Sequence, residues 1–236
     1  MGTARTTEWL VRDDEGKEQI ALKQRLLAER HDDVFNALPA TEDACSEILE
    51  AIGTGNRRLL PRVHPLVEAA LLVPEDLCVL VDGVLVAGCV CFPSHWHLAD
   101  KIGHPLTDVH ARVPGYASEL GAKVDSFLRR LTTQTVVARR NFTIHELPDL
   151  FAPDVPPILG VAPHDQWLRS ERQTLRRLPR SDAILFTIRT QQVQLQHVDR
   201  PTRQRLAARL RAEPEQLIAY RDLTDRLPVL IDWLSP

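Results

Sequence analysis

The apolar run LCVLVDGVLVAGCVCF places the strongest constraint on how this chain folds. It consists of two segments rich in β-branched residues, residues 77–81 and 84–92, which are separated only by Asp82 and Gly83. An Asp-Gly pair accepts positive φ at both central positions of a type I′ turn, the two-residue connection typical of antiparallel strands. The run therefore predicts a β-hairpin, and Pro93 ends its second strand because proline has no backbone N–H to donate.

The rest of the chain alternates between helical and extended patterns. Apolar residues recur at helical spacing in some stretches, and β-branched residues mark others as strands. Proline at 214 and at 228 breaks the last helical stretch. Helices are expected over residues 16–30, 41–52 (with Thr41 as N-cap), 66–73, 117–131 and 203–233, and further strands over 135–144, 167–178 and 183–195.

The order of these elements predicts an α+β fold. Two strands, a helical crossover and three strands follow one another, which is the order of a PAS-like five-stranded antiparallel sheet with connecting helices, flanked by N- and C-terminal helices. With 44% apolar residues the chain can build an ordinary core. We expect a single domain over 1–236, with an N-terminal helical segment (1–63), a PAS-like core (64–198) and C-terminal helices (199–236). Five prolines make residues 147–163 an extended surface loop.

The strand expected over residues 167–178 is unusual because neither of its faces is apolar. Arg169, Glu171 and Gln173 lie on one side, while Arg172 and Thr174 lie on the other. Two interpretations remain open for such a pattern. It is typical of an edge strand that carries charge against aggregation, or of a polar face that lines a pocket for an anionic ligand.

Charge and cysteine content narrow the function classes. A formal net charge of −3 and a pI near 6.3 argue against a nucleic-acid binder. The sequence shows no signal peptide and no apolar run long enough to span a bilayer, so we expect a cytoplasmic protein with no membrane partner. Cys45, Cys78, Cys89 and Cys91 form no CxxC pair, and in such apolar surroundings they are expected to be buried, reduced thiols.

Histidines gather where the first hairpin ends, at positions 95, 97, 104 and 110. His95 and His97 share one face of an extended segment and could chelate a metal, although no third ligand is placed nearby. His64 and His104 both precede proline and are expected in turns. The sequence has no P-loop, dinucleotide-binding glycine motif, nucleophile elbow or HExxH motif. Their absence argues against the common classes of hydrolase and nucleotide-binding protein.

Several stretches together point to one family. They are CFPSHWHLADKIGHPL at residues 91–106, HARVPGY at 110–116, LRSERQTLRRLP at 168–179, LFTIRT at 185–190, and the opening segment 20–39. In these stretches the chain resembles the haem-dependent oxidative N-demethylases, specifically their haem-carrying alpha subunit. It is similar to a divergent or shortened member, because the connection before His64 is short and Phe142 and Gln191 stand where the family shows Trp and Tyr.

The resemblance implies a haem b cofactor, whose iron performs electron and O₂ chemistry beyond the reach of any side chain. The implied reaction is monooxygenase-like: O₂ is activated, the N-methyl group of a small methylated amine is hydroxylated, and formaldehyde leaves. The chain has no flavin or [2Fe–2S] motif, so electrons would come from a separate reductase. A PAS-like haem or small-ligand sensor without turnover is the alternative, and a structural subunit without cofactor is a third reading.

Such a site needs an axial ligand and cations for the two propionates. His110 is the expected iron ligand, because Val113-Pro114-Gly115 would hold the backbone beside it rigidly, and His145 at a strand end is the alternative. Guanidinium groups suit carboxylates because they offer paired donors. The expected cofactor-binding residues are Arg172, Arg176, Arg189, Lys101, Arg140 and Tyr116.

Overall fold

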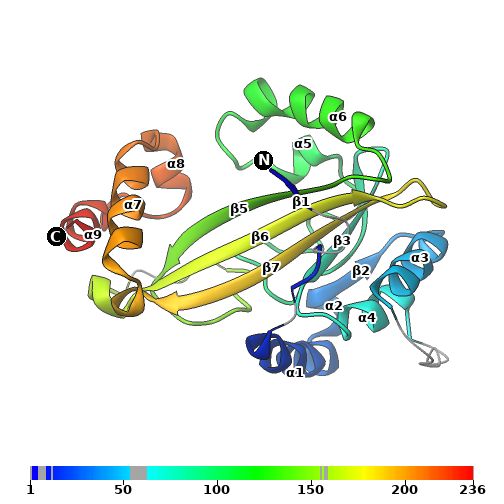
Figure 1. Cartoon of the computed structure of the whole chain (residues 1–236), viewed down its shortest axis with the longest axis horizontal. Helices are drawn as coiled ribbons and strands as arrows, with labels where there is room; N and C mark the ends of the chain where they lie inside the picture. The colour runs from blue at the N-terminus through cyan, green and yellow to red at the C-terminus, as the bar shows by residue number, and fades with distance from the viewer. Residues whose placement is uncertain are drawn as a thin grey trace.

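A seven-stranded antiparallel sheet, in the order β1-β5-β6-β7-β3-β4-β2, runs through the computed structural model (Figure 1). The structure describes residues 2–4, 9–11, 13–53, 63–154, 156 and 159–235, and only the backbone of residues 2–4. The strands are β1 (Gly2–Ala4), β2 (Phe35–Ala37), β3 (Asp76–Val81), β4 (Val84–Cys89), β5 (Val136–His145), β6 (Trp167–Arg177) and β7 (Ile184–Gln194).

The predicted α+β class with an antiparallel sheet is confirmed. The predicted number of strands, five, is wrong. β1 and β2 have three residues each and pair at the two edges of the sheet. Strands this short carry too little pattern to be recognised from sequence. The edge-strand interpretation of residues 167–178 is also wrong, because β6 pairs with β5 on one side and with β7 on the other.

The first hairpin has the predicted turn. Asp82 and Gly83 have φ values of 49° and 78°, as a type I′ turn requires. β4 ends at Cys89 rather than at Phe92, because the next N–H groups find other acceptors. The carboxylate of Asp76 accepts hydrogen bonds from the backbone N–H of Cys91 and of Phe92, both at 2.9 Å.

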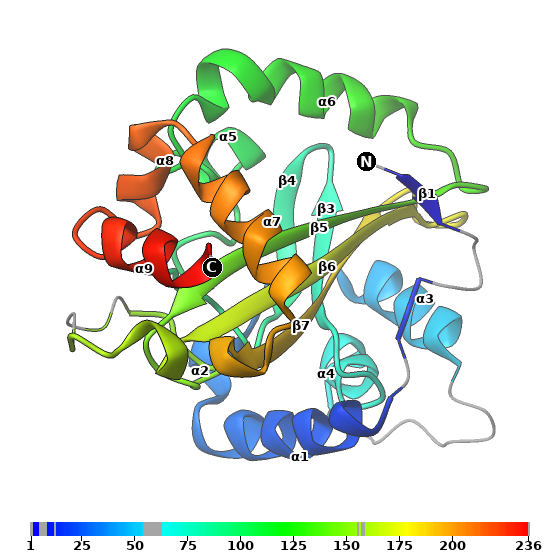
Figure 2. The same cartoon turned by 60° about the vertical axis from the view of Figure 1, so that its left-hand side comes forward.

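Helices lie on both faces of the sheet and at one end (Figures 1 and 2). The helical stretches expected at 16–30, 41–52 and 117–131 are present, with an added π-helical turn, Tyr116–Leu120, before α6. The helix expected at 66–73 is shorter, and the C-terminal stretch forms three helices that begin at Arg200. The helices are α1 (Asp14–Glu29), α2 (His31–Val34), α3 (Glu42–Ile52), α4 (Pro65–Ala70), α5 (Leu106–Val109), α6 (Gly121–Arg130), α7 (Arg200–Arg211), α8 (Glu215–Tyr220) and α9 (Leu227–Leu234).

The two faces of the sheet have separate apolar cores. Alternate residues of a strand point to opposite faces. On β7, Leu185 packs in the core shared with α1, α3 and α4, whereas Ile184 packs in the core shared with α6. We call these two sides of the sheet the α1 face and the α6 face. The helices α7, α8 and α9 form a third core against the far end of β5 and β6, around Ile144 and Leu168.

Two smaller expectations have different outcomes. Thr41 does not cap α3 as predicted, because its hydroxyl donates to the carbonyl of Leu38 at 2.8 Å. The prediction of buried, free thiols is confirmed for all four cysteines. Among the described helices, none combines the length and the apolar character that crossing a membrane requires.

Candidate functional site

His110 lies at the C-terminal end of α5 and makes two hydrogen bonds to that helix. Its backbone N–H donates to the carbonyl of Leu106 at 3.0 Å, and its ring Nδ1 lies 2.9 Å from the same oxygen. A carbonyl only accepts, so Nδ1 carries the hydrogen and Nε2 carries the lone pair. No described residue occupies Nε2 with a hydrogen bond. The half-buried imidazole is therefore a preformed donor of one lone pair.

The surroundings of His110 keep its ring neutral. Burial lowers the pKa of His110, and the positive charges of Arg139 and Lys101 lower it further, against the raising effect of the bond to Leu106. A neutral imidazole is the form that can ligate a metal ion. Lys101, predicted at the site, is thus close to His110, and Arg139 is a cation that the sequence interpretation did not include.

Tyr116 stacks on His110. The two ring centroids are 4.3 Å apart and the rings are inclined by only 12°. Tyr116 is 7% exposed and begins the π-helical turn, directly after Gly115, whose φ of 73° suits glycine. Burial raises the pKa of Tyr116, so its phenol keeps the proton at neutral pH. The stack fixes the plane of the imidazole.

A row of polar side chains crosses the α6 face on β5 and β6. The Nε of Arg139 donates to Oε1 of Gln173 at 2.6 Å, and Nε2 of Gln173 donates to Oε2 of Glu171 at 2.9 Å. Oε1 of Glu171 lies 3.6 Å from the Nε of Arg169. This polar row explains why residues 167–178 lack an apolar face on this side: the strand is central, and its charges pair with one another.

The three arginines expected to bind propionates lie on the α1 face, with the sheet between them and His110. Arg172 donates to the backbone carbonyl of Trp9 at 3.2 Å, and the guanidinium of Arg176 lies 4.8 Å from the centre of the Trp9 ring. Arg189 is 1% exposed and donates to Asp13 at 2.7 Å and to Gln19. These partners join the N-terminal segment to the sheet.

Arg140 is exposed and has the strand parity of the α1 face, so it also points away from His110. Of the predicted cofactor-binding residues, Lys101 and Tyr116 lie near His110. The four arginines lie on the α1 face, on the other side of the sheet. The alternation of residues along β5 could have identified Arg139 as a residue on the same face as His145. Arg139 has the parity of His145 on β5 and is paired directly with Gln173 on β6.

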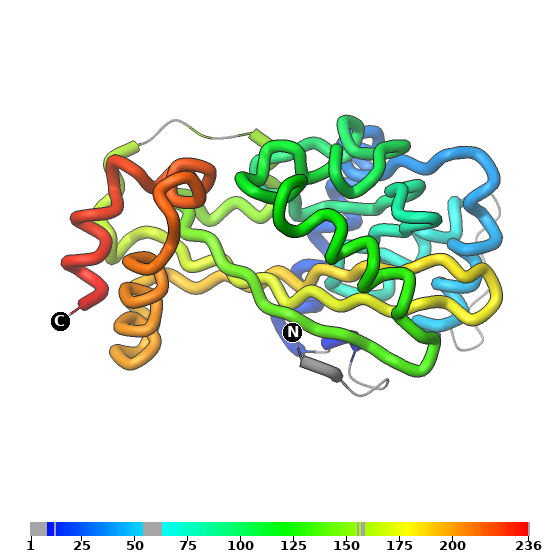
Figure 3. The backbone as a smooth tube through the Cα atoms, turned by 90° about the horizontal axis from the view of Figure 1, so that it is seen from above, coloured from blue at the N-terminus to red at the C-terminus, as the bar shows by residue number. Residues whose placement is uncertain are grey.

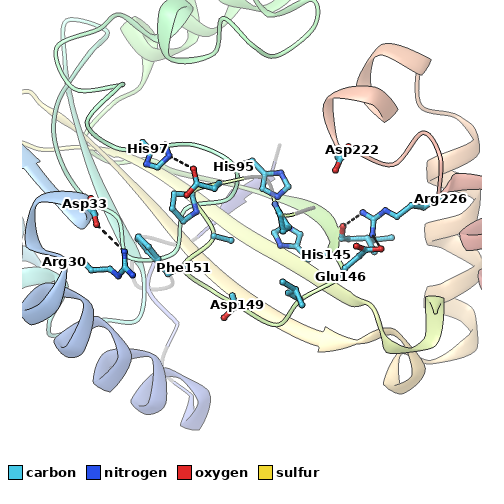
Figure 4. A pocket seen from close by; sticks show the side chains of 16 residues that line it. Arg30, Asp33, His95, His97, His145, Glu146, Asp149, Phe151, Asp222 and Arg226 are labelled. Atoms are coloured by element: carbon cyan, nitrogen blue, oxygen red, sulfur yellow. Dashed lines mark hydrogen bonds and ion pairs between the residues drawn. The ribbon is translucent and has the colours of Figure 1, made fainter. Parts of the chain in front are cut away.

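His145, the alternative ligand, lies at the end of β5. Its Nε2 is 3.2 Å from the hydroxyl of Ser94, and its ring stacks on that of His95 at a centroid distance of 5.1 Å and an angle of 14°. Burial and the nearby Arg169 lower the pKa of His145 to about 3. Both rings line a cavity of about 490 Å³ (Figure 4). This volume lies within the range of small-molecule sites.

Several other charged groups of the cavity are paired. His97 lies 3.0 Å from Asp154, and Arg226 lies 3.5 Å from Glu146. Lone pairs of imidazole lie in the ring plane, so the nearly parallel rings of His95 and His145 do not converge on one ion. Within the described residues there is no group of three or more His, Cys, Asp or Glu side chains that could hold a metal. His97 pairs with Asp154 and His95 stacks on His145, so the pair does not form the chelate considered above.

The two positions that depart from the family pattern lie at the third core (Phe142) and on the α1 face (Gln191). Phe142 packs beneath the guanidinium of Arg221, 5.1 Å from the ring centre, and Gln191 donates to Glu15 at 3.1 Å. Neither side chain approaches His110, so their changed identity does not alter its surroundings. The short connection before His64 lies outside the described residues.

Comparison with known families places the chain. A family described as haem-dependent oxidative N-demethylase, alpha subunit-like, matches residues 54–230. The matched region contains His110 and its stacking partner Tyr116, the whole polar row and His145. It extends over most of the chain and ends within α9. The chain therefore belongs to the haem-dependent oxidative N-demethylase, alpha subunit-like family.

Proposed function

We propose that this chain binds haem b through His110 and performs O₂-dependent oxidative N-demethylation of a small methylated amine, with release of formaldehyde. The observation that carries the proposal is the state of His110. Its Nδ1–H is held by the carbonyl of Leu106, its ring is neutral, and Nε2 is left to ligate iron. A histidine ligand oriented in this way through its other nitrogen is the usual arrangement at metal sites.

The residues around His110 fit the chemistry of a haem. An imidazole would suit haem iron as a ligand, and Lys101 and Arg139 are cations that would be available for the propionates. We assign the propionates to these two residues, because Arg172, Arg176 and Arg189 are engaged with the N-terminal segment. His145 fits less well, since ligation through Nε2 would break its bond to Ser94.

When bound, haem would supply the O₂ activation that no side chain provides. The protein's own residues then have defined tasks. His110 holds the group at Nε2 and keeps its proton on Nδ1, while Tyr116 holds the imidazole plane and retains the proton on its phenol oxygen. Electrons come from a separate reductase, as the description of the family as an alpha subunit supports.

We also propose that the core is PAS-like. The five longer strands follow the order β5-β6-β7-β3-β4, with α5 and α6 in the connection between β4 and β5. In this arrangement the connecting helices cover the face on which the ligand is bound. His110 and Tyr116 lie in that connection, which supports the α6 face as the haem side.

The visible spectrum of the purified chain after loading with haem tests the ligand assignment. We expect a Soret band in the wild type that is lost or strongly shifted in His110→Ala. The matched variant His145→Ala removes the alternative imidazole and should keep the wild-type spectrum. A spectrum that changes only in His145→Ala would transfer the ligand to the 490 Å³ cavity, and an unchanged spectrum in both variants would refute the proposal.

The reaction is tested by formaldehyde release from mono-, di- and trimethylamine with O₂ and a chemical electron donor. We expect release from at least one amine by the haem-loaded chain and none by His110→Ala. A chain that binds haem through His110 but releases no formaldehyde from any of these amines would be a sensor rather than an enzyme.

A further inference from the structure

The helix α7 carries an unusual concentration of positive charge. Its sequence RPTRQRLAARLR has five arginines, and no acidic residue occurs between Asp199 and Glu213. Four of the five arginines are exposed, and the fifth, Arg203, packs on the ring of Trp233. The chain as a whole has a net charge of −3, so the overall composition does not reveal this local excess of positive charge.

The exposed arginines border a flat strip of the helix. At about 100° per residue, Arg200 and Arg211 lie on one flank, and Arg205 and Arg209 lie on the other. Between them lie the exposed residues Gln204, Ala208 and Ala212, whereas Leu206, Ala207 and Leu210 are buried in the third core. We call this surface, formed by residues 200, 204, 205, 208, 209, 211 and 212, the arginine face.

The charges of the arginine face are largely uncompensated within the part of the chain that the structure describes. Only Arg209 has a carboxylate within 4 Å, that of Glu213 at 3.3 Å. Arg205 donates to the hydroxyl of Thr202, and Arg211 donates to that of Ser235. Asp199 lies near Arg205, but both its oxygens accept hydrogen bonds from Thr202 at the helix N-terminus. Exposed like charges held together in this way cost free energy unless an acidic surface covers them.

Negative charge is gathered at the other end of the molecule. The helix α3 carries Glu42, Asp43, Glu47 and Glu50 and no basic residue, and its Glu47 and Glu50 pair with Arg180 at 3.8 and 2.7 Å. It lies at the opposite end of the long axis from α7 (Figures 1 and 3). An acidic partner approaching the molecule is therefore steered toward α7 by its local excess of exposed arginine.

We propose that the arginine face is the docking surface for an acidic face of the subunit that delivers electrons. This inference rests on the proposed function, which needs electrons from outside the chain. The family is described as an alpha subunit, and its match over residues 54–230 includes all of α7 but not α3. Charge complementarity selects and orients such a partner and sets how fast it binds.

Binding of a plant-type [2Fe–2S] ferredoxin, an acidic one-electron carrier, to the chain without haem tests the proposal by titration calorimetry. We expect binding at an ionic strength of about 0.01 M that weakens strongly at about 0.15 M, where charges are screened beyond roughly 8 Å. Arg200→Glu/Arg205→Glu/Arg211→Glu should weaken binding by about tenfold or more. The triple variant Arg200→Gln/Arg205→Gln/Arg211→Gln is less disruptive to folding. Its affinity should lie between that of the wild type and that of the glutamate variant.

The matched control is Arg25→Glu/Arg129→Glu/Arg130→Glu, which changes the net charge equally at exposed positions on α1 and α6. It should retain binding within about threefold, because it leaves the local potential of α7 intact. Equal weakening in both triple variants, or no salt-dependent binding by the wild type, would overturn the proposal. So would a dimer of the wild type that the α7 variant dissolves, since the surface would then bind a second copy. Absence of a Soret band would refute only the proposed function, because this titration needs no haem.

Discussion

Burial of His145 predicts a loss of stability in mild acid whose size follows from its pKa. The pKa of His145 falls from 6.5 to about 3 in the folded protein, so below pH 6.5 the unfolded chain binds a proton that the folded chain does not. The contribution is fully present above pH 6.5 and is lost as the pH falls toward 3. Between pH 7 and pH 5 the loss from this one group is about 2 kcal/mol. That is a large share of the 5–15 kcal/mol by which domains are usually stable.

Urea unfolding at pH 7 and at pH 5 measures this loss in the wild type and in His145→Gln, which has no titrating group at this position. We expect the stability of the wild type relative to the variant to fall by about 2 kcal/mol between the two pH values. His95→Gln should show a change of the same sign, because burial also lowers the pKa of His95. A wild type and a His145→Gln variant that lose equal stability would show that His145 is solvated in the folded protein and that the stacked pair is wrong.

Other substitutions test the packing on both faces of the sheet. Asp13→Asn leaves the buried guanidinium of Arg189 without its nearest carboxylate and should cost about 3 kcal/mol in urea unfolding, whereas Arg189→Met should cost less because the carboxylate that it leaves unpaired is partly exposed. Gly88→Ala brings a Cβ to 2.8 Å from Leu98 and should cost about 1–3 kcal/mol, with a smaller added cost in the Leu98→Ala background. The thiol of Cys45, whose pKa burial raises to about 12, should resist thiol reagents at pH 8 until the protein unfolds.

The first hairpin was predictable because its signal is local. Asp82 and Gly83 specify a turn with positive φ at both residues, and the strands on either side have enough β-branched residues to be recognised. β1 and β2 were not predictable in this way. Each pairs at an edge through only three residues, and the chain must first fold for those pairings to exist.

In the candidate site, the proximity of His110 and Tyr116 was predictable, and the faces of the strand residues were not. His110 and Tyr116 lie within one short segment, so their proximity needs no knowledge of the sheet. To place Arg172 and Arg176 relative to His110, one must know which face of β6 points toward His110. A strand is normally oriented by its apolar side, and β6 has charged residues on both. The alternation along β6 was predicted correctly, but no feature of the sequence assigns each side of the strand to a face of the sheet.

The family-like stretch on β6 therefore contributes alternate residues to different contacts on the two faces of the sheet. Arg172 and Arg176 hold the N-terminal segment through Trp9, on the side away from His110. Glu171 and Gln173 continue the polar row that begins at Arg139, on the side of His110. A block shared with a family thus does not identify every residue in it as part of the site. On a central strand with charges on both faces, each residue must be assigned by the face to which it points.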